Sequence, residues 1–189
     1  CWDMHGFNRL GGNSVAETVV AGMIVGEYIA DYCDSSESDI DISTLQVAEF
    51  LKHEQQNIDS LVTSKGSESA TEIMREMQTL MTDKVGIFRS HEQLNAAVEQ
   101  LQVLYARSRN IGLSYRSVAV NPEIVTAYRV RRMLKLALCV AYGALQRTES
   151  RGAHYREDYP ERNDRDWLRR TLASWPTSDQ TLPNLDYED

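Results

Sequence analysis

The residues with the clearest chemical potential lie near the start of the chain, in the stretch His5-Gly6-Phe7-Asn8-Arg9-Leu10-Gly11-Gly12-Asn13-Ser14-Val15. Its glycines predict an irregular loop that leads into a helix beginning near Ser14. Such a helix start presents unpaired backbone N–H groups and positive partial charge, which favour an anion or an electron-rich carbonyl. Arg9 adds a planar guanidinium that can hold a carboxylate or phosphate through two parallel hydrogen bonds. The loop is therefore a candidate anion site, and an ordinary Gly-rich turn with an exposed arginine is the alternative.

The helix that follows this loop carries both a start signal and an apolar surface. Ser14 and Glu17 form an S-x-x-E pattern, in which the hydroxyl and the carboxylate bind the first free N–H groups of a helix. From Val15 to Ile29, apolar residues occupy most sides of the helix, which is typical of a buried helix. The acidic, serine-rich segment 31–41 that comes next predicts a solvated linker.

Three amphipathic helices are expected beyond the linker, and each begins with an S-x-x-[EQ] pattern, at Ser43, Ser69 and Ser90. Their apolar residues recur at helical spacing, and we assign them to core packing. In the second and third helices these residues are Ile73, Met77, Leu80, Met81, Val85, Leu94, Ala97, Val98, Leu101, Leu104 and Tyr105. The first helix has a similar stripe: Leu45, Ala48, Leu51, Ile58, Leu61 and Val62.

A longer helix is predicted from Asn121-Pro122-Glu123 to about Thr148. The asparagine supplies an N-cap, the proline suits the first helical position, and the glutamate lies in the first turn. The middle of this helix is apolar on nearly every side, so we expect it at the centre of a bundle. After Gly152 the chain becomes charged and proline-punctuated, which predicts surface loops and one short strand.

These elements together predict a mainly α fold. We expect a leading loop and helix in residues 1–31, an acidic linker in 32–42, a helical bundle in 43–149, and an irregular tail in 150–189 that packs on the bundle.

Composition excludes several classes of protein. With 42% hydrophobic and 25% charged residues, the chain has the composition of a soluble globular protein. The net charge of -8 argues against nucleic-acid binding, and no apolar run is long enough to cross a bilayer. Cys1, Cys33 and Cys139 form no pairing framework, which favours a reducing compartment. A chain that opens at a cysteine is expected to be a piece of a longer polypeptide.

Metal and hydrolytic sites are not predicted. The four histidines, His5, His53, His91 and His154, are scattered, and no His-x-x-x-His pair or Ser-His-Asp arrangement emerges. We therefore expect no metal ligand and no catalytic residue within this chain. For His5, local hydrogen bonding is the simpler interpretation, although its pKa range also permits catalysis.

Several segments resemble the flavoprotein family of fumarate reductases and succinate dehydrogenases. The stretch from His5 to Ser14 is similar to that family's HGxNRLGxNS motif. Val85–Arg89, Leu138–Glu149 and Ser150–Asp158 also resemble the family's C-terminal half, in the same order. Cys1–Phe7 resembles the flavoprotein subunits of quinol:fumarate reductases of the epsilonproteobacterial type. The resemblance covers essentially the whole chain and identifies it as a C-terminal fragment of such a subunit.

The resemblance implies roles for residues of the opening loop. Arg9 matches the arginine that binds a carboxylate of fumarate or succinate. Ser14 and Val15 match the pair whose backbone contacts the flavin ring, and Asn13 shapes that turn. The leading loop and helix then become a remnant of the FAD-binding domain, with FAD present in the full-length parent and absent from the fragment.

The resemblance also implies the setting. The parent reduces fumarate to succinate, or runs the reverse, in an anaerobic respiratory complex related to the tricarboxylic acid cycle enzyme. Its partners are an iron-sulfur subunit and a quinone-binding membrane-anchor subunit, and its place is the cytoplasmic face of the bacterial inner membrane. The isolated fragment is expected to be inactive. For the segment Ser150–Arg156, a structural or domain-docking role and contact with the active-site region both stay open.

Two alternatives remain. The fragment can be a non-catalytic helical docking module that braces the flavoprotein, or a piece of a related flavoenzyme such as L-aspartate oxidase or succinate dehydrogenase.

Overall fold

The computed structural model describes residues 5, 8–35, 45–116, 120–177 and 180–188. The chain forms two compact units, residues 1–52 and 53–189, and each is described by itself. The unit boundary lies within a helix rather than in the predicted linker 32–42, most of which falls outside the described residues. The four-part division drawn from the sequence stays a prediction.

The first unit contains α1 (Asn13–Ser35) and the first part of α2 (Leu45–Thr63). Helix α1 extends four residues beyond the predicted end of its segment, into the acidic stretch. The expectation that α1 is buried is wrong for the first unit by itself, in which none of the residues of α1 is buried. A helix with apolar residues on most sides needs a second layer to cover it, and the described part of this unit supplies none.

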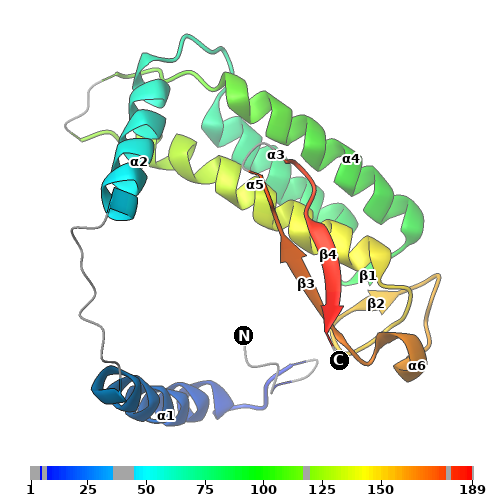
Figure 1. Ribbon diagram of the computed structural model, residues 1–189. Coiled ribbons are helices and arrows are strands. Elements are labelled where there is room, and N and C mark those ends of the chain that lie inside the picture. Colours follow the sequence, from blue (N-terminus) through cyan, green and yellow to red (C-terminus); the bar gives the residue numbers. More distant parts are fainter. Residues whose placement is uncertain (1–4, 6–7, 36–44, 117–119, 178–179, 189) are drawn as a thin grey trace. The chain divides into compact units, whose positions relative to one another are not determined.

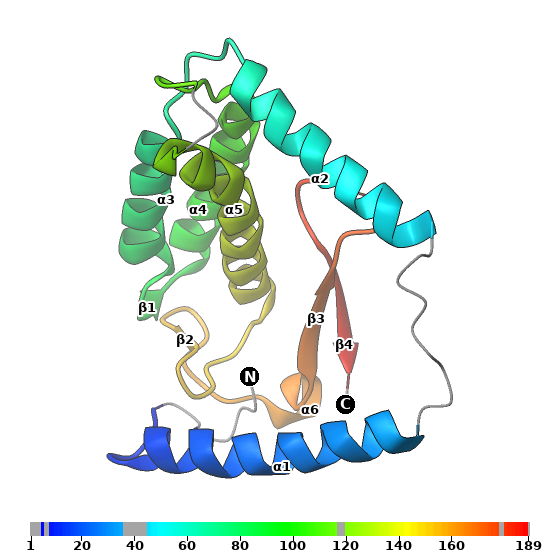
Figure 2. The ribbon, with the colours of Figure 1, turned by 90° about the vertical axis from the view of Figure 1, so that its left-hand side faces the viewer.

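The second unit is built on three helices that pack side by side: α3 (Ala70–Val85), α4 (His91–Arg107) and α5 (Pro122–Gln146) (Figures 1 and 2). Their buried residues form one apolar core, joined by Leu61 and Val62 from the end of α2. The core positions predicted for α3 and α4 are confirmed, with Met81 partly buried. In α2 the prediction fails at Ala48 and Leu51, which are both exposed.

Local signals start these helices where the sequence places them. The Ser69 hydroxyl accepts a hydrogen bond from the N–H of Glu72 at 3.4 Å, and Ser90 accepts one from Gln93 at 3.3 Å. The Asn121 side chain accepts from the N–H of Glu123 at 3.0 Å. Each cap satisfies one of the N–H groups that a helix start leaves open. Helix α5 ends at Gln146, two residues before the predicted end.

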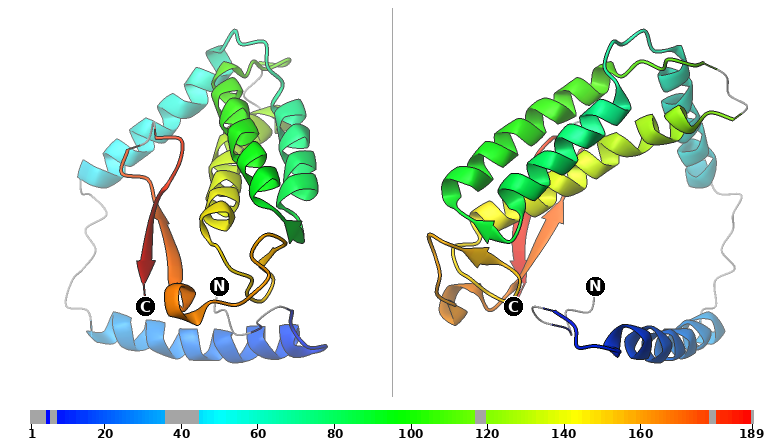
Figure 3. Two further views of the ribbon diagram at one scale, coloured as in Figure 1. Left: turned by 90° about the vertical axis from the view of Figure 1, so that its right-hand side faces the viewer. Right: turned by 180° about the vertical axis from the view of Figure 1, so that it is seen from behind.

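The tail is more regular than predicted. Strand β2 (Tyr155–Arg156) pairs in parallel with β1 (Phe88–Arg89), which follows α3 directly. A short helix, α6 (Asp164–Trp167), leads into β3 (Arg170–Ser174), which pairs antiparallel with β4 (Asn184–Glu188). The short 3-10 helix η1 (Ser108–Asn110) follows α4. The β3–β4 ribbon runs along α5 (Figure 3). The pairing of β3 with β4 satisfies backbone N–H and C=O groups of the tail. The apolar residues of the tail alone do not predict these strands.

Candidate functional site

The opening loop forms a tight turn at the N-terminus of α1. Gly12 has a φ of 82°, in the left-handed region that glycine adopts without strain. The Leu10 carbonyl accepts from the N–H of Asn13 at 3.2 Å, and the Gly12 carbonyl accepts from Val15 at 3.2 Å. The turn thus starts the helix at Asn13, one residue earlier than the sequence predicts.

A histidine ties this loop to the helix. Nε2 of His5 lies 2.9 Å from Oε2 of Glu17, and both side chains are about three-quarters buried. This contact explains why the capping box predicted for Ser14 and Glu17 is wrong. Ser14 lies inside the first turn, and the Glu17 carboxylate is directed to His5 rather than to the backbone at the helix start.

The predicted site residues gather at this end of α1. Asn13 is exposed, Ser14 is half-buried and Val15 is 70% exposed, all in the first helical turn, while Arg9 is exposed in the loop before it. No acceptor for the Ser14 N–H lies among the residues that the structure describes. The arrangement therefore offers a cation, an open N–H group and the positive end of a 23-residue helix.

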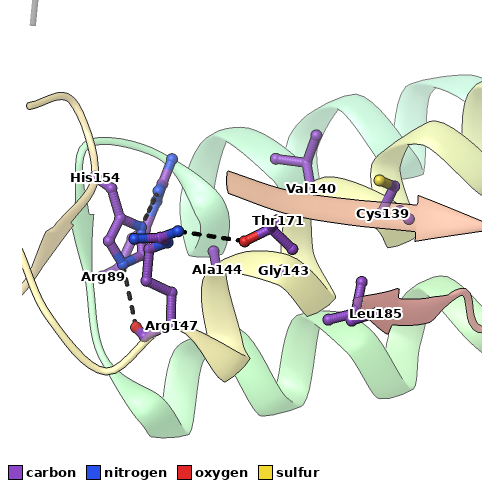
Figure 4. A pocket seen from close by; sticks show the side chains of 10 residues that line it. Arg89, Cys139, Val140, Gly143, Ala144, Arg147, His154, Thr171 and Leu185 are labelled. Atoms are coloured by element: carbon purple, nitrogen blue, oxygen red, sulfur yellow. Dashed lines mark hydrogen bonds between the residues drawn. The ribbon is translucent and has the colours of Figure 1, made fainter. Parts of the chain in front are cut away.

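A second constellation, not predicted as a site, lies in the other unit. A pocket of about 290 Å³ between α5, β1 and the β3–β4 ribbon is lined by three basic residues, Arg89, Arg147 and His154 (Figure 4). The remaining lining residues are Cys139, Val140, Gly143, Ala144, Thr171, Ala173 and Leu185. Burial raises the pKa of the Cys139 thiol, so this cysteine is not an activated nucleophile.

His154 joins the two arginines of this pocket. Its Nδ1 lies 2.9 Å from Nη1 of Arg89, and its Nε2 lies 3.2 Å from the Arg147 carbonyl oxygen. Because an arginine can only donate, Nδ1 accepts and the proton of the ring lies on Nε2. Burial, with a smaller contribution from the nearby cations Arg89, Arg156 and Arg147, lowers the pKa of His154 below its usual value. The imidazole is therefore neutral at pH 7.

A buried carboxylate holds the pocket's other arginine. Glu149 is fully buried and accepts from Nη1 of Arg147 at 2.6 Å, from Nε of Arg151 at 2.8 Å, and from the N–H of Asn163 at 2.8 Å. Burial alone would raise the pKa of Glu149, but these hydrogen bonds outweigh it and the pKa lies below its ordinary value.

Sequence reasoning missed this cluster, although it passed through two segments that resemble the flavoprotein family. One segment contains Arg89 and the other contains His154, and their separation of 65 positions in the sequence conceals the contact. The parallel pairing of β1 with β2 brings the two together.

A larger pocket of about 490 Å³ lies between the end of α2, α4 and α5. Glu54 and Arg132 line it, and Glu54 accepts hydrogen bonds from Tyr128 and Arg132. The Tyr128 hydroxyl, followed by Arg132, lowers the pKa of Glu54 to about 2. The guanidinium of Arg132 also stacks 3.9 Å from the Tyr128 ring centre, as expected for a cation on an aromatic face.

Two other classes of feature are absent from the described ranges. They contain no group of three or more His, Cys, Asp or Glu side chains that could hold a metal ion. None of the described helices is long and apolar enough to cross a membrane.

Comparison with known proteins gives consistent results. Residues 74–189 match the family model described as "Fumarate reductase flavoprotein C-term". The chain is 52% identical over its full length to the fumarate reductase flavoprotein subunit of Helicobacter pylori strain 26695, and covers 26% of that protein. It is 33% identical, again over its full length, to the succinate dehydrogenase flavoprotein subunit of Bacillus subtilis strain 168, and covers 32% of it.

Solved structures agree. A structure of FrdA from the E. coli quinol fumarate reductase superposes with a TM-score of 0.83 and 31% sequence identity, covering 96% of this chain and 31% of that one. The chain thus spans between a quarter and a third of the length of the proteins it resembles.

Proposed function

Because this chain belongs to the flavoprotein family of fumarate reductases and succinate dehydrogenases, we propose that it is part of a flavoprotein that reduces fumarate to succinate, or runs the reverse, by hydride transfer with FAD. The observation that supports this most is the placement of Arg9 beside the N-terminus of α1, in a loop with the family's motif. The relatives of this chain are oxidoreductase subunits by name, and the direction of the reaction belongs to the proposal.

The first turn of α1 fits the electron-rich edge of a flavin. The Ser14 N–H has no acceptor among the described residues, and the helix end carries partial positive charge. Ser14 and Val15 would hold the flavin through their backbone, with Asn13 shaping the turn. When bound, FAD supplies hydride chemistry that no side chain of this chain provides.

Arg9 would act on the substrate. Its planar guanidinium binds one carboxylate of the dicarboxylate through two charge-assisted hydrogen bonds and fixes the orientation of the carbon chain. The contact between His5 and Glu17 would hold the loop against α1, so that Arg9 keeps its place. We assign no proton transfer to this chain.

The setting follows from the same proposal. An iron-sulfur subunit would exchange electrons with the flavin, and a quinone-binding membrane-anchor subunit would connect them to the quinone pool. The flavoprotein would lie at the cytoplasmic face of the bacterial inner membrane as a peripheral subunit of an anaerobic respiratory complex.

Replacement of Arg9 tests the proposal in the flavoprotein that contains this chain. Arg9→Ala removes a charge-assisted bidentate contact, which should cost about 2 to 4 kcal/mol of transition-state stabilisation. The loss should appear as a lower kcat/KM for fumarate. Arg9→Lys keeps the charge without the fork and should recover part of the loss. The exposed Arg75, replaced by Ala, is the matched control. An unchanged rate for Arg9→Ala would reject the role of Arg9.

Two assays separate the alternatives. The parent should use fumarate and succinate and leave L-aspartate unreacted; turnover of aspartate would identify an L-aspartate oxidase. The 189-residue chain supplied with FAD and a reduced dye should show no fumarate-dependent dye oxidation. Activity of the chain alone would refute the need for the rest of the flavoprotein.

The docking-module alternative is favoured by one observation. Helix α1 has an apolar sequence and no buried residue, as expected of a helix that packs on something outside its own unit. Under this alternative, Arg9→Ala should leave catalysis intact, and polar substitutions of exposed α1 residues such as Val19 and Met23 should impair assembly.

A further inference from the structure

The pocket that contains His154 has two chemically distinct ends. Figure 4 shows Arg89, Arg147 and His154 at one end and Val140, Cys139 and Leu185 at the other. No carboxylate is among the described residues that line it. The pocket is therefore cationic at one end and apolar at the other, in a protein whose net charge is -8.

The charge of the pocket comes chiefly from Arg89. Its Nε donates to the carbonyls of Val85 and Gly86 at 3.1 and 2.9 Å, which fixes the guanidinium at the end of α3. In the described part of the chain, no carboxylate lies within ion-pair distance of Arg89, and its Nη1 donates to the neutral ring of His154. A half-buried guanidinium without a counter-ion favours an anion beside it.

Arg147 contributes charge but few open donors. Its Nη1 binds Glu149 and the Trp167 carbonyl, and its Nη2 binds the Arg169 carbonyl at 2.6 Å and the Thr171 hydroxyl at 3.4 Å. Since the Thr171 oxygen accepts from Arg147, its own O–H is available to donate.

We propose that this pocket binds a short-chain monocarboxylic acid, with the carboxylate at Arg89 and the Thr171 hydroxyl and the hydrocarbon chain against Val140 and Leu185. The volume of about 290 Å³ is roughly ten times the share of one water in the liquid, so the pocket has room for several carbons as well as a carboxylate. A second carboxylate would lie at the apolar end, where the described lining residues offer no cation and the Cys139 thiol is only a weak donor. This site lies within the second unit and does not depend on the flavin-dicarboxylate function proposed for Arg9.

Calorimetric titration of the purified protein at constant pH and ionic strength tests the proposal with acetate, propionate and butyrate. Affinity should rise roughly fourfold with each added methylene, as expected when each CH₂ leaves water. Butyrate should bind with a dissociation constant on the order of 1 mM. In the Arg9→Ala variant, which lacks the contact proposed for the dicarboxylate, succinate, phosphate and chloride should bind at least tenfold more weakly than butyrate. Equal binding of all these anions, no dependence on chain length, or no binding of butyrate would overturn the proposal.

Variants locate the site. Arg89→Gln should weaken butyrate binding at least tenfold, while Arg75→Gln, which removes the same charge from the exposed surface of α3, should leave it unchanged. Leu185→Ala should flatten the dependence on chain length and keep acetate binding. Thermal unfolding of each variant shows whether it is folded.

A measurement on the unsubstituted protein keeps the test decisive if Arg89→Gln does not fold. Butyrate should shift the ring resonances of His154 in an NMR titration, with the dissociation constant found by calorimetry. Saturable binding that leaves His154 unaffected would place the ligand elsewhere and refute this assignment.

The same carboxylate chemistry can come from a polypeptide. N-acetyl-glutamate amide carries a carboxylate on a short apolar stem attached to a peptide unit. It should bind more weakly than butyrate if the ligand is a free acid. Tighter binding would show that the pocket accepts a glutamate side chain of a protein and would overturn the free-acid assignment. Arg9→Ala separates this site from the dicarboxylate site, because butyrate binding should survive that substitution.

Discussion

Arg156 and Asp158 form a bidentate ion pair at the end of the helical bundle. Nε and Nη2 of the fully buried Arg156 donate to the two carboxylate oxygens of Asp158 at 2.8 and 2.6 Å. Its Nη1 donates to the carbonyls of Ala144 and Leu145 at 2.9 and 3.0 Å, so a cation satisfies the last turn of α5. Asp158 also accepts from the N–H of His91, at the start of α4. The pair therefore connects the ends of two helices.

Removal of the charge of Asp158 should destabilise the protein strongly. Asp158→Asn leaves the buried Arg156 guanidinium without its counter-ion, and the free energy of unfolding should fall by about 3 kcal/mol. Urea denaturation followed by circular dichroism measures the change. Glu72→Gln breaks the exposed pair with Arg75 and should change stability by less than about 0.5 kcal/mol. If the two substitutions change the free energy of unfolding equally, the burial of Arg156 does not increase the contribution of its ion pair to stability.

Acid should destabilise the protein through carboxylates whose pKa values are lowered in the folded state, and three of them lie between α5 and β3. Hydrogen bonds from Arg156 lower the pKa of Asp158 to about 2, and Arg162 followed by Arg151 lowers the pKa of Asp164 to about 2. The pKa of Glu149 also lies below its ordinary value, since the hydrogen bonds from Arg151, Asn163 and Arg147 outweigh burial. A lowered folded-state pKa gives stability that is present above the ordinary carboxyl pKa and is lost as pH falls through the folded value. The urea concentration at the unfolding midpoint should therefore decrease as the pH is lowered from about 4 to about 2. This decrease should be smaller in Glu149→Gln.

His154 should add a second pH dependence at milder acidity. Burial, with the charges of Arg89, Arg156 and Arg147, lowers its folded-state pKa below the ordinary 6.5, so the unfolded chain binds the proton more tightly. Stability is then fully present above about pH 6.5 and declines as pH falls toward the folded pKa. Protonation of Nδ1 would also break its hydrogen bond from Arg89.

The thermal midpoint measured from pH 8 to pH 5 checks this expectation. His154→Asn should remove most of the slope in that range, while His91→Asn, at an exposed position, should retain it. If the pH dependence of the thermal midpoint persists in His154→Asn, another titrating group causes it.

A close backbone crossing should make alanine costly at Gly112. A Cβ on Gly112 would lie 1.8 Å from the Gly66 carbonyl oxygen, where the segment after α4 pairs with the segment before α3. Gly112→Ala must push these backbones apart and should cost about 2 kcal/mol or more. A Cβ on Gly143, within α5, would meet no described atom of another element within 4 Å, so Gly143→Ala should stabilise the helix by about 0.5 to 1 kcal/mol. Chemical denaturation of both variants should give opposite signs.

The helices of the second unit could be predicted because their determinants are local. The hydroxyls of Ser69 and Ser90 each bind an N–H three residues away, and the apolar residues of α3 and α4 recur with the period of the helix. The opening loop was also recognisable, since a Gly-rich turn before a helix is written in consecutive residues. The hydrogen-bond partner of Glu17 could not be predicted. Whether its carboxylate binds the backbone at the helix start or the His5 ring depends on the path of the loop.

The sequence by itself determined where α3, α4 and α5 begin, which residues α3 and α4 bury, and where Arg9 lies relative to a helix start. It did not determine which apolar residues α5 leaves exposed, and Leu136 and Val140 are among them. Only the tertiary structure decided that Arg89 meets His154 across 65 residues and that the charged Glu149 and Arg156 are buried. It also decided the pairing of β3 with β4. The physical reason is range: a cap or an apolar stripe is satisfied within a few residues of the chain. A buried charge or a short strand is stable only when distant segments bring its partner, and no local pattern records which segment that is.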